Sequence, residues 1–157
     1  MLFETWYPTT HQRLSAALLL TFGDIDLAQD AADEAIARAY ERWDRVGTME
    51  SPMGWVFSVG FNVARRRLRR RGFEDRVMRR RRPAEVPPPA GELWHLVADL
   101  PPRQRQAVVL RHVGQLREAE IADAMGITRG AVSSTLRSAY ASLRVELADE
   151  LTEEEVI

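Results

Sequence analysis

The end of one predicted helix carries a dense group of arginines. Six of the seven positions from 65 to 71 are arginine: Arg65, Arg66, Arg67, Arg69, Arg70 and Arg71. A helix C-terminus stabilises one or two cations, but the mutual repulsion of a larger group calls for an anionic partner. Trp55 and Phe61 lie on the same predicted helix, and arginines interleaved with aromatic rings are typical of surfaces that bind single-stranded nucleic acid. For Trp55, a place in the hydrophobic core is an alternative with the same weight as a place on such a surface.

A second pattern, from Glu118 to Arg144, predicts a helix-turn-helix. Apolar residues three and four apart mark two helices, which Gly126-Ile127-Thr128 separates. Gly126 suits the left-handed conformation that ends a helix, and the Thr128 hydroxyl suits the N-cap of the next. In DNA-binding proteins of this type the second helix enters the major groove. Its candidate DNA contacts are Arg129, Gly130, Ser133, Ser134 and Arg137. The alternative is an ordinary helical hairpin in a small bundle.

The residues that support catalysis or metal binding in other proteins form no such pattern in this chain. His11, His95 and His112 stand singly, without carboxylates at metal-ligand spacing. The sequence has no glycine-rich phosphate loop. The segment from Asp24 to Asp30 lacks the glycine and the terminal glutamate of an EF-hand. We therefore expect no catalytic site, no metal, no cofactor and no small-molecule substrate.

Composition points to a folded protein whose charge is divided into blocks. The chain has 157 residues, 45% of them apolar, and no cysteine, which excludes disulfide frameworks and cysteine-ligated zinc. The net charge of −1 conceals −5 over residues 1–64, +9 over 65–82 and −5 over 83–157. No signal peptide is visible, and the most apolar early run, residues 14–22, is too short to cross a membrane. We expect a cytoplasmic protein with no membrane contact.

Helical periodicity along the chain predicts an all-α fold. The first helix lies within residues 2–22, with a separate turn or a kink at Pro8. The second begins at Asp24 or Asp26 and carries Asp30, Asp33 and Glu34 on its outer face, where a solvated surface is the simplest reading. Further helices are predicted over residues 52–71 and 92–99 and from Pro101 onward.

A proline-rich segment divides these helices into two predicted domains. Residues 83–91, PAEVPPPAG, are typical of a stiff linker with a reach of roughly 28 Å. We therefore predict two small helical domains, residues 1–82 and 92–157, joined by a linker at 83–91. The second domain contains the helix-turn-helix and ends in a tail from Glu146 with six acids and no base, for which we expect a helix end that frays into solvent.

The two halves together resemble the extracytoplasmic-function sigma factors, the members of the sigma-70 family that have only regions two and four. The region-two pattern matches residues 28–36, AQDAADEAI, and residues 38–40, 43–44, 55 and 62 ahead of the arginines. The region-four pattern matches Leu100-Pro101, Arg105 and residues 120–128. The resemblance covers nearly all of residues 2–146.

This resemblance implies a role for each charged segment. Asp30, Asp33 and Glu34 would bind core RNA polymerase. The helix that opens at Thr128 would recognise the minus-thirty-five promoter element as duplex. The loop of residues 45–51 and the following helix would melt and hold the minus-ten element as a single strand, through Trp55, Asn62, Arg65, Arg66, Arg69 and Arg70. The implied partners are core polymerase and promoter DNA, and an anti-sigma factor is a further partner that the resemblance allows.

The sequence departs from the family pattern at several positions. Asp33 and Ile36 replace a glutamine and a phenylalanine, and Arg66 replaces an aspartate. The recognition helix has Ser138 and Tyr140 where basic residues are common, which predicts weaker phosphate anchoring. Two other functions remain open: a polymerase-independent helix-turn-helix repressor or adaptor, and a structural or RNA-binding module.

Overall fold

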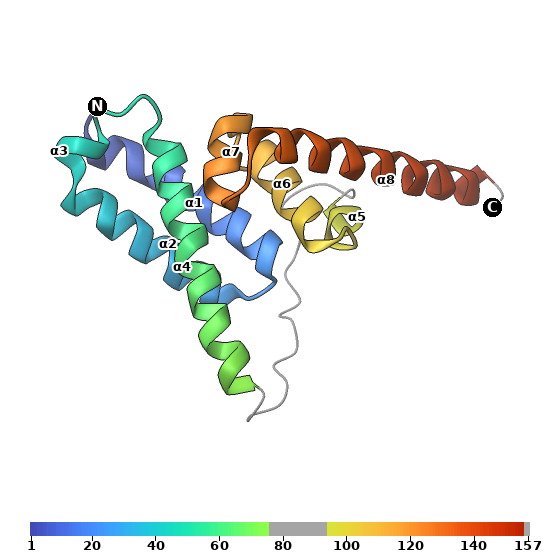
Figure 1. Ribbon diagram of the computed structural model, residues 1–157, viewed down its shortest axis with the longest axis horizontal. Helices are drawn as coiled ribbons and strands as arrows, with labels where there is room; N and C mark the ends of the chain where they lie inside the picture. Colours follow the sequence, from blue (N-terminus) through green and yellow to red (C-terminus); the bar gives the residue numbers. More distant parts are fainter. Residues whose placement is uncertain (76–93, 156–157) are drawn as a thin grey trace.

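The computed structural model describes residues 1–75 and 94–155, with side chains for 1–72 and 94–149. All of the regular secondary structure in these ranges is helical, which confirms the predicted all-α fold class. The elements are α1 (Phe3–Phe22), α2 (Ile25–Glu41), α3 (Trp43–Val46), α4 (Pro52–Asp75), α5 (Trp94–Ala98), α6 (Pro102–His112), α7 (Glu118–Met125) and α8 (Arg129–Glu155). Figure 1 shows α8 extending beyond the body of the molecule toward the C-terminus. The helix continues through Glu155, past the point at which we expected fraying.

The N-terminal helices α1, α2 and α4 pack on one another. Gly23 has a φ of 69° and ends α1, and Asp24 then caps α2 by accepting a hydrogen bond from the Leu27 amide at 2.9 Å. Gly60 brings α4 close to α1, because a Cβ at this position would lie 3.0 Å from Leu14 Cδ1. Leu14 and Phe57 are fully buried at the centre of this packing.

Helix α1 runs continuously through Pro8, so the first of the two expectations for this residue, a separate turn before it, is wrong. A proline inside a helix removes a single backbone hydrogen bond, and packing elsewhere can offset that loss. Here the first turn is held by aromatic contacts. The ring centroid of Trp43 lies 5.3 Å from that of Phe3 and 4.8 Å from that of Trp6.

The helix-turn-helix formed by α7 and α8 agrees with the sequence prediction. Gly126 takes the left-handed conformation, with a φ of 68°, and ends α7. The Thr128 hydroxyl accepts a hydrogen bond from the Ala131 amide at 3.1 Å and so caps α8. Val132 and Leu136 are buried and hold α8 against the rest of the C-terminal helices.

Helices from both sides of residues 76–93 share one hydrophobic core. The buried cluster runs without interruption from Leu14 and Phe57 to Leu110 and Ile121. Helix α4 packs along α7, and α1 packs against α6 (Figure 1). The predicted linker at 83–91 and the arginines at 76 and 79–82 lie outside the described residues. The division into two domains therefore stays a prediction, and the described helices form one packed unit.

Candidate nucleic-acid and polymerase interfaces

The arginines of α4 divide between two faces of the helix. Arg67 and Arg71 are one helical turn apart and both face α2. Arg67 lies 2.8 Å from Glu34 through Nη2 and 3.2 Å from Asp30 through Nη1, and Arg71 pairs with the carboxylate of Asp24. These two arginines therefore join α4 to the acidic helix.

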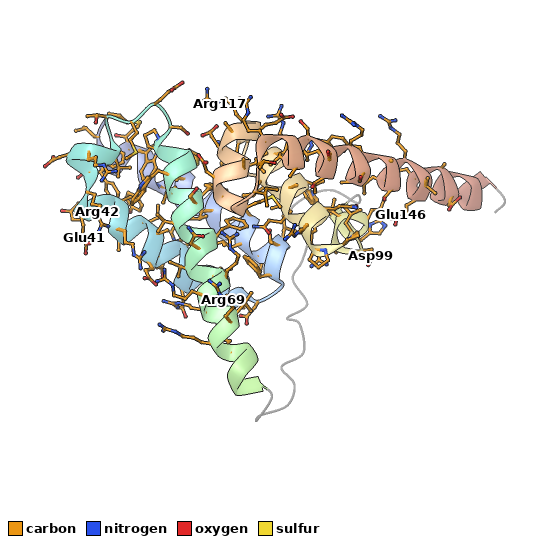
Figure 2. The ribbon with its side chains drawn as sticks, in the orientation of Figure 1. Glu41, Arg42, Arg69, Asp99, Arg117 and Glu146 are labelled. Carbon is orange, nitrogen blue, oxygen red and sulfur yellow. The ribbon has the colours of Figure 1, made fainter. Side chains whose placement is uncertain are left out.

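The other face of α4 carries exposed arginines. Arg66, Arg69 and Arg70 are exposed, and they form no hydrogen bond or ion pair within the part of the chain that the structure describes. Figure 2 labels Arg69 on this helix. A cationic face of this kind can follow the phosphates of a nucleic-acid strand.

Arg65 lies between these two groups and contacts α7. Its Nη2 donates to Asn62 Oδ1 and to the backbone carbonyl oxygen of Ala124, both at 2.6 Å. Burial, with a further contribution from the nearby charge of Arg69, lowers the pKa of Arg65. The buried Nη1 has no hydrogen-bond partner in the described structure. Arg65 is thus held against the helix-turn-helix, unlike its exposed neighbours.

The two remaining residues that the sequence assigned to the minus-ten strand differ in exposure. Asn62 is exposed on α4, beside Arg65. Trp55 is half-buried and packs against the hydrophobic core, so it combines a core contact with an accessible edge. Asn62 and Trp55 lie on the same helix as the exposed arginines.

The candidate polymerase-binding residues lie on the outer face of α2. The side chain of Asp30 is 57% exposed and that of Asp33 is 70% exposed. Asp33 Oδ1 lies 2.7 Å from His11 Nε2 of α1. Both carboxylates remain accessible at one edge to a cationic partner.

Glu34 is less accessible, because two arginines enclose it. Its side chain is 33% exposed and contacts Arg38 one turn later on α2 and Arg67 on α4. Burial alone would raise the pKa of Glu34, but hydrogen bonds and charge interactions with Arg67 and Arg38 outweigh it, and the pKa lies below its ordinary value. Glu34 is therefore an ionised group with partners inside the molecule.

The start of α8 presents most of the predicted major-groove residues to solvent. Ser133 differs, because it is half-buried and its hydroxyl donates to Glu118 Oε2 of α7 at 3.0 Å. The exposed members are Arg129, Gly130, Ser134 and Arg137. This surface has two cations and small neighbours that permit a close approach of a base pair edge.

A polar contact between α7 and the start of α4 was not predicted from the sequence. The Ser51 hydroxyl donates to Glu120 and accepts from the Gly54 amide at 3.0 Å. Arg117 Nη1 lies 3.4 Å from Glu50 Oε1, and Arg117 is labelled at the start of α7 in Figure 2. The two residues are 69 positions apart, so their pairing depends on how distant helices pack.

Two other classes of site are absent from the described residues. No group of histidine and carboxylate side chains in the described ranges is arranged to hold a metal ion. None of the helices there combines the length and the hydropathy needed to cross a membrane.

The fold defines the chain as an all-helical protein with a helix-turn-helix formed by α7 and α8. Residues 90–143 match the family described as sigma-70, region 4. The RNA polymerase sigma-E factor of Streptomyces avermitilis is 31% identical over 151 residues, covering 92% of this chain and 84% of that protein. The RNA polymerase sigma-E factor of Streptomyces coelicolor is 32% identical over 152 residues, covering 92% and 85%.

A solved structure has the same fold. The sigma factor RpoE of Bartonella quintana, in complex with the anti-sigma factor NepR, superposes with a TM-score of 0.76 at 19% identity, covering 93% of this chain and 96% of that one. This match shows the fold alone, and the relatives above confirm the resemblance found in the sequence: the chain belongs to the extracytoplasmic-function sigma factors of RNA polymerase.

Proposed function

We propose that this sigma factor binds core RNA polymerase through the outer face of α2 and directs initiation at promoters with two recognised elements. The observation that carries the proposal is the separation of charge on the folded chain. Exposed carboxylates lie on α2, exposed arginines lie on one face of α4, and two further arginines lie at the start of α8. Each surface suits a different partner, and core polymerase supplies the chemistry.

The minus-ten element is assigned to α4. Arg66, Arg69 and Arg70 follow the strand backbone, while Asn62 and the accessible edge of Trp55 contact bases. A stacked base contributes about 1–3 kcal/mol, whereas one exposed ion pair contributes about 0–1 kcal/mol. Affinity therefore comes from several arginines together, and base preference comes from the aromatic edge and the loop before α4. Arg65 is assigned to the same strand, although its guanidinium is bonded to α7 in the described structure.

The minus-thirty-five element is assigned to the helix-turn-helix. Arg129 and Arg137 bind phosphates or guanine edges, and Gly130 and Ser134 allow the helix to approach the groove closely. Ser133 contributes indirectly, because its hydroxyl is bonded to Glu118. Because this helix has few cations, its binding to the duplex is weak. The helix-turn-helix therefore contributes more to the position of the promoter than to the affinity for it.

Two further parts of the proposal concern organisation and partners. Residues 1–82 and 92–157 act as separate units joined by a linker at 83–91 when the chain is bound to polymerase. The protein works in the cytoplasm, where polymerase and promoter are found.

The Bartonella quintana relative was solved with an anti-sigma factor. We propose that this chain also binds an anti-sigma factor.

Binding to core polymerase tests the assignment of α2. The variant Asp30→Asn with Asp33→Asn should bind core polymerase more weakly than the unaltered chain, as measured by fluorescence anisotropy at low salt. Glu41→Gln, an exposed acid at the far end of the same helix, is the matched control and should bind normally. Equal binding by all three proteins would contradict the assignment. Site-specific duplex binding without polymerase would instead favour a repressor or adaptor.

A further inference from the structure

His112 at the end of α6 and Tyr140 in the middle of α8 form a polar pair on the surface of the C-terminal helices. His112 Nε2 lies 2.8 Å from Tyr140 Oη, and the two rings meet edge to face with their centroids 5.9 Å apart. His112 is exposed and Tyr140 is half-buried. The hydrogen bond therefore joins two groups that a bound anion can reach.

The pair lies next to the surface that we assign to the minus-thirty-five duplex. Tyr140 is three residues after Arg137 and four before Arg144, so the three side chains share one face of α8. Both arginines are exposed. When the first turns of a recognition helix enter the major groove, its later turns approach the sugar-phosphate backbone. Tyr140 therefore has a position suited to a phosphate contact, and it stands where the family pattern has a basic residue.

The charged groups around His112 do not favour its protonation in the free chain. Arg111 precedes it on α6, and no carboxylate of α1, α5, α7 or α8 forms an ion pair with it within the ranges that the structure describes. On α7, Glu118 accepts from the Ser133 hydroxyl instead. Burial, with a further contribution from the charge of Arg111, lowers the pKa of His112 below its ordinary value of 6.5. His112 is therefore mainly neutral at neutral pH in the free chain.

Protonation changes what the pair offers to a ligand. A neutral imidazole either accepts or donates at Nε2, whereas an imidazolium donates at both ring nitrogens. Protonated His112 therefore donates to Tyr140 Oη, and the phenol hydrogen is left free for an external acceptor. The pair then has a positive charge and an O–H donor next to Arg137. A phosphate oxygen is an acceptor that suits both.

We propose that His112 and Tyr140 bind one backbone phosphate of the minus-thirty-five duplex, and that His112 takes up a proton when they do. In its protonated form the pair supplies the cation that the family pattern has at position 140. The inference rests on the proposed function, because it adds contacts to the same duplex surface. A phosphate beside His112 raises the pKa of His112 in the complex, whereas the free chain keeps it low. The affinity for the duplex is therefore highest below the pKa of the complex, and it falls as the pH rises through that value.

Duplex binding by the holoenzyme at different pH values tests the inference. The full-length chain is combined with core polymerase, and the anisotropy of a labelled duplex that carries only the minus-thirty-five element is measured between about pH 6 and pH 8. A pKa that rises by about one unit on binding changes the affinity by about tenfold. We expect the affinity of the native chain to fall by about three- to tenfold across this interval.

Substitutions separate the contribution of His112 from that of other titrating groups. His112→Gln should bind at both ends of the interval with about the affinity that the native chain has at the higher pH. His112→Arg has a permanent charge and should keep the higher affinity throughout. Tyr140→Phe should lose affinity mainly at the lower pH, because the phenol donor is missing. His95→Gln changes another exposed histidine of the C-terminal helices and is the matched control, which should keep the native profile.

A neutral methylphosphonate at single positions of the duplex identifies the phosphate. One such substitution should remove the pH dependence of the native chain and have little further effect on His112→Gln. Inorganic phosphate, added at constant ionic strength, should not change the affinity. Competition by inorganic phosphate would assign the pair to a free anion and overturn the duplex contact.

Two further results would overturn the inference and leave the proposed function intact. One is the same pH profile in the native chain and in His112→Gln. The other is a pH dependence that no methylphosphonate position removes. Absence of duplex binding by the native holoenzyme at every pH would instead contradict the assignment of the minus-thirty-five element to the helix-turn-helix, and the inference that rests on it.

Discussion

Arg67 Nη2 of α4 lies 2.8 Å from Glu34 Oε2 of α2. This ion pair joins the helix that we assign to the promoter strand with the helix that we assign to polymerase. The same guanidinium also reaches Asp30 at 3.2 Å, so a single arginine contacts two of the three candidate polymerase-binding acids. The arginine group of α4 thus serves structure on one face, and we propose that its other face binds nucleic acid.

Loss of this ion pair should lower stability modestly. Arg67→Ala is expected to reduce the free energy of unfolding by about 0.5–1 kcal/mol, because both side chains are about one third exposed and solvent screens the charges. Chemical denaturation measures the change. Arg66→Ala, one position earlier and exposed, should have almost no effect on stability. A larger loss in Arg66→Ala than in Arg67→Ala would contradict the division of faces.

The pKa of Glu34 predicts a dependence of stability on pH. Because its pKa is lowered below the ordinary value of 4.5, the folded state binds fewer protons than the unfolded state. The stabilisation is complete above about pH 4.5 and disappears as pH falls through the lower folded value. The difference in unfolding free energy between the native chain and Glu34→Gln should shrink as the pH falls below about 4.5. A difference that does not change as the pH falls would show that Glu34 is not the responsible group.

The exposed arginines of α4 should act in promoter opening and leave polymerase binding intact. We expect Arg69→Ala with Arg70→Ala to reduce strand opening, detected by permanganate reactivity of unpaired thymines. The salt slope of single-strand binding should fall by about 0.7 for each phosphate that the variant no longer neutralises. Arg103→Ala, an exposed arginine on α6, is the control. Equal loss of core binding and strand opening would show that this face has been misassigned.

The start of α8 should contribute to duplex recognition. If Arg137 reads a guanine edge, Arg137→Ala should weaken binding to the minus-thirty-five duplex by about 1–3 kcal/mol and relax the preference at that base pair. Anisotropy titrations with single-base variants of the duplex measure both effects. Arg144→Ala, exposed two turns later on α8, should change affinity less and leave base preference unaltered. If only Arg144→Ala lost the base preference, the residues that recognise bases would lie further along α8 than we propose.

Local chemistry explains which elements the sequence could predict. Gly126 and Thr128 predict the turn between α7 and α8 because left-handed geometry and N-capping depend only on neighbouring residues. The same reasoning predicts that α2 starts at Asp24 or Asp26, and Asp24 is the observed N-cap. Pro8 misleads because aromatic packing against Trp43, distant in sequence, keeps the first turn of α1 helical.

The distribution of charges required the tertiary structure. Three arginines of α4 have the same side chain but different surroundings. Arg65 contacts α7, Arg67 contacts α2 and Arg69 is exposed. Which face of α4 each arginine occupies follows from helical periodicity, but which helices cover those faces does not. Likewise, Tyr40 is 63% exposed, although its ring centroid lies 5.0 Å from that of Phe3 on α1. The Ser51–Glu120 contact joins residues 69 positions apart and has no local signal.

Run-off transcription with purified core RNA polymerase tests the central claim most directly. Core polymerase and this chain together should produce a transcript of defined length from a cognate promoter fragment, selected from genomic DNA by the reconstituted holoenzyme. Core polymerase alone should produce none, and the Asp30→Asn, Asp33→Asn chain should produce less. Failure of the chain to bind core polymerase at low salt, with no defined transcript from any fragment, would contradict the account.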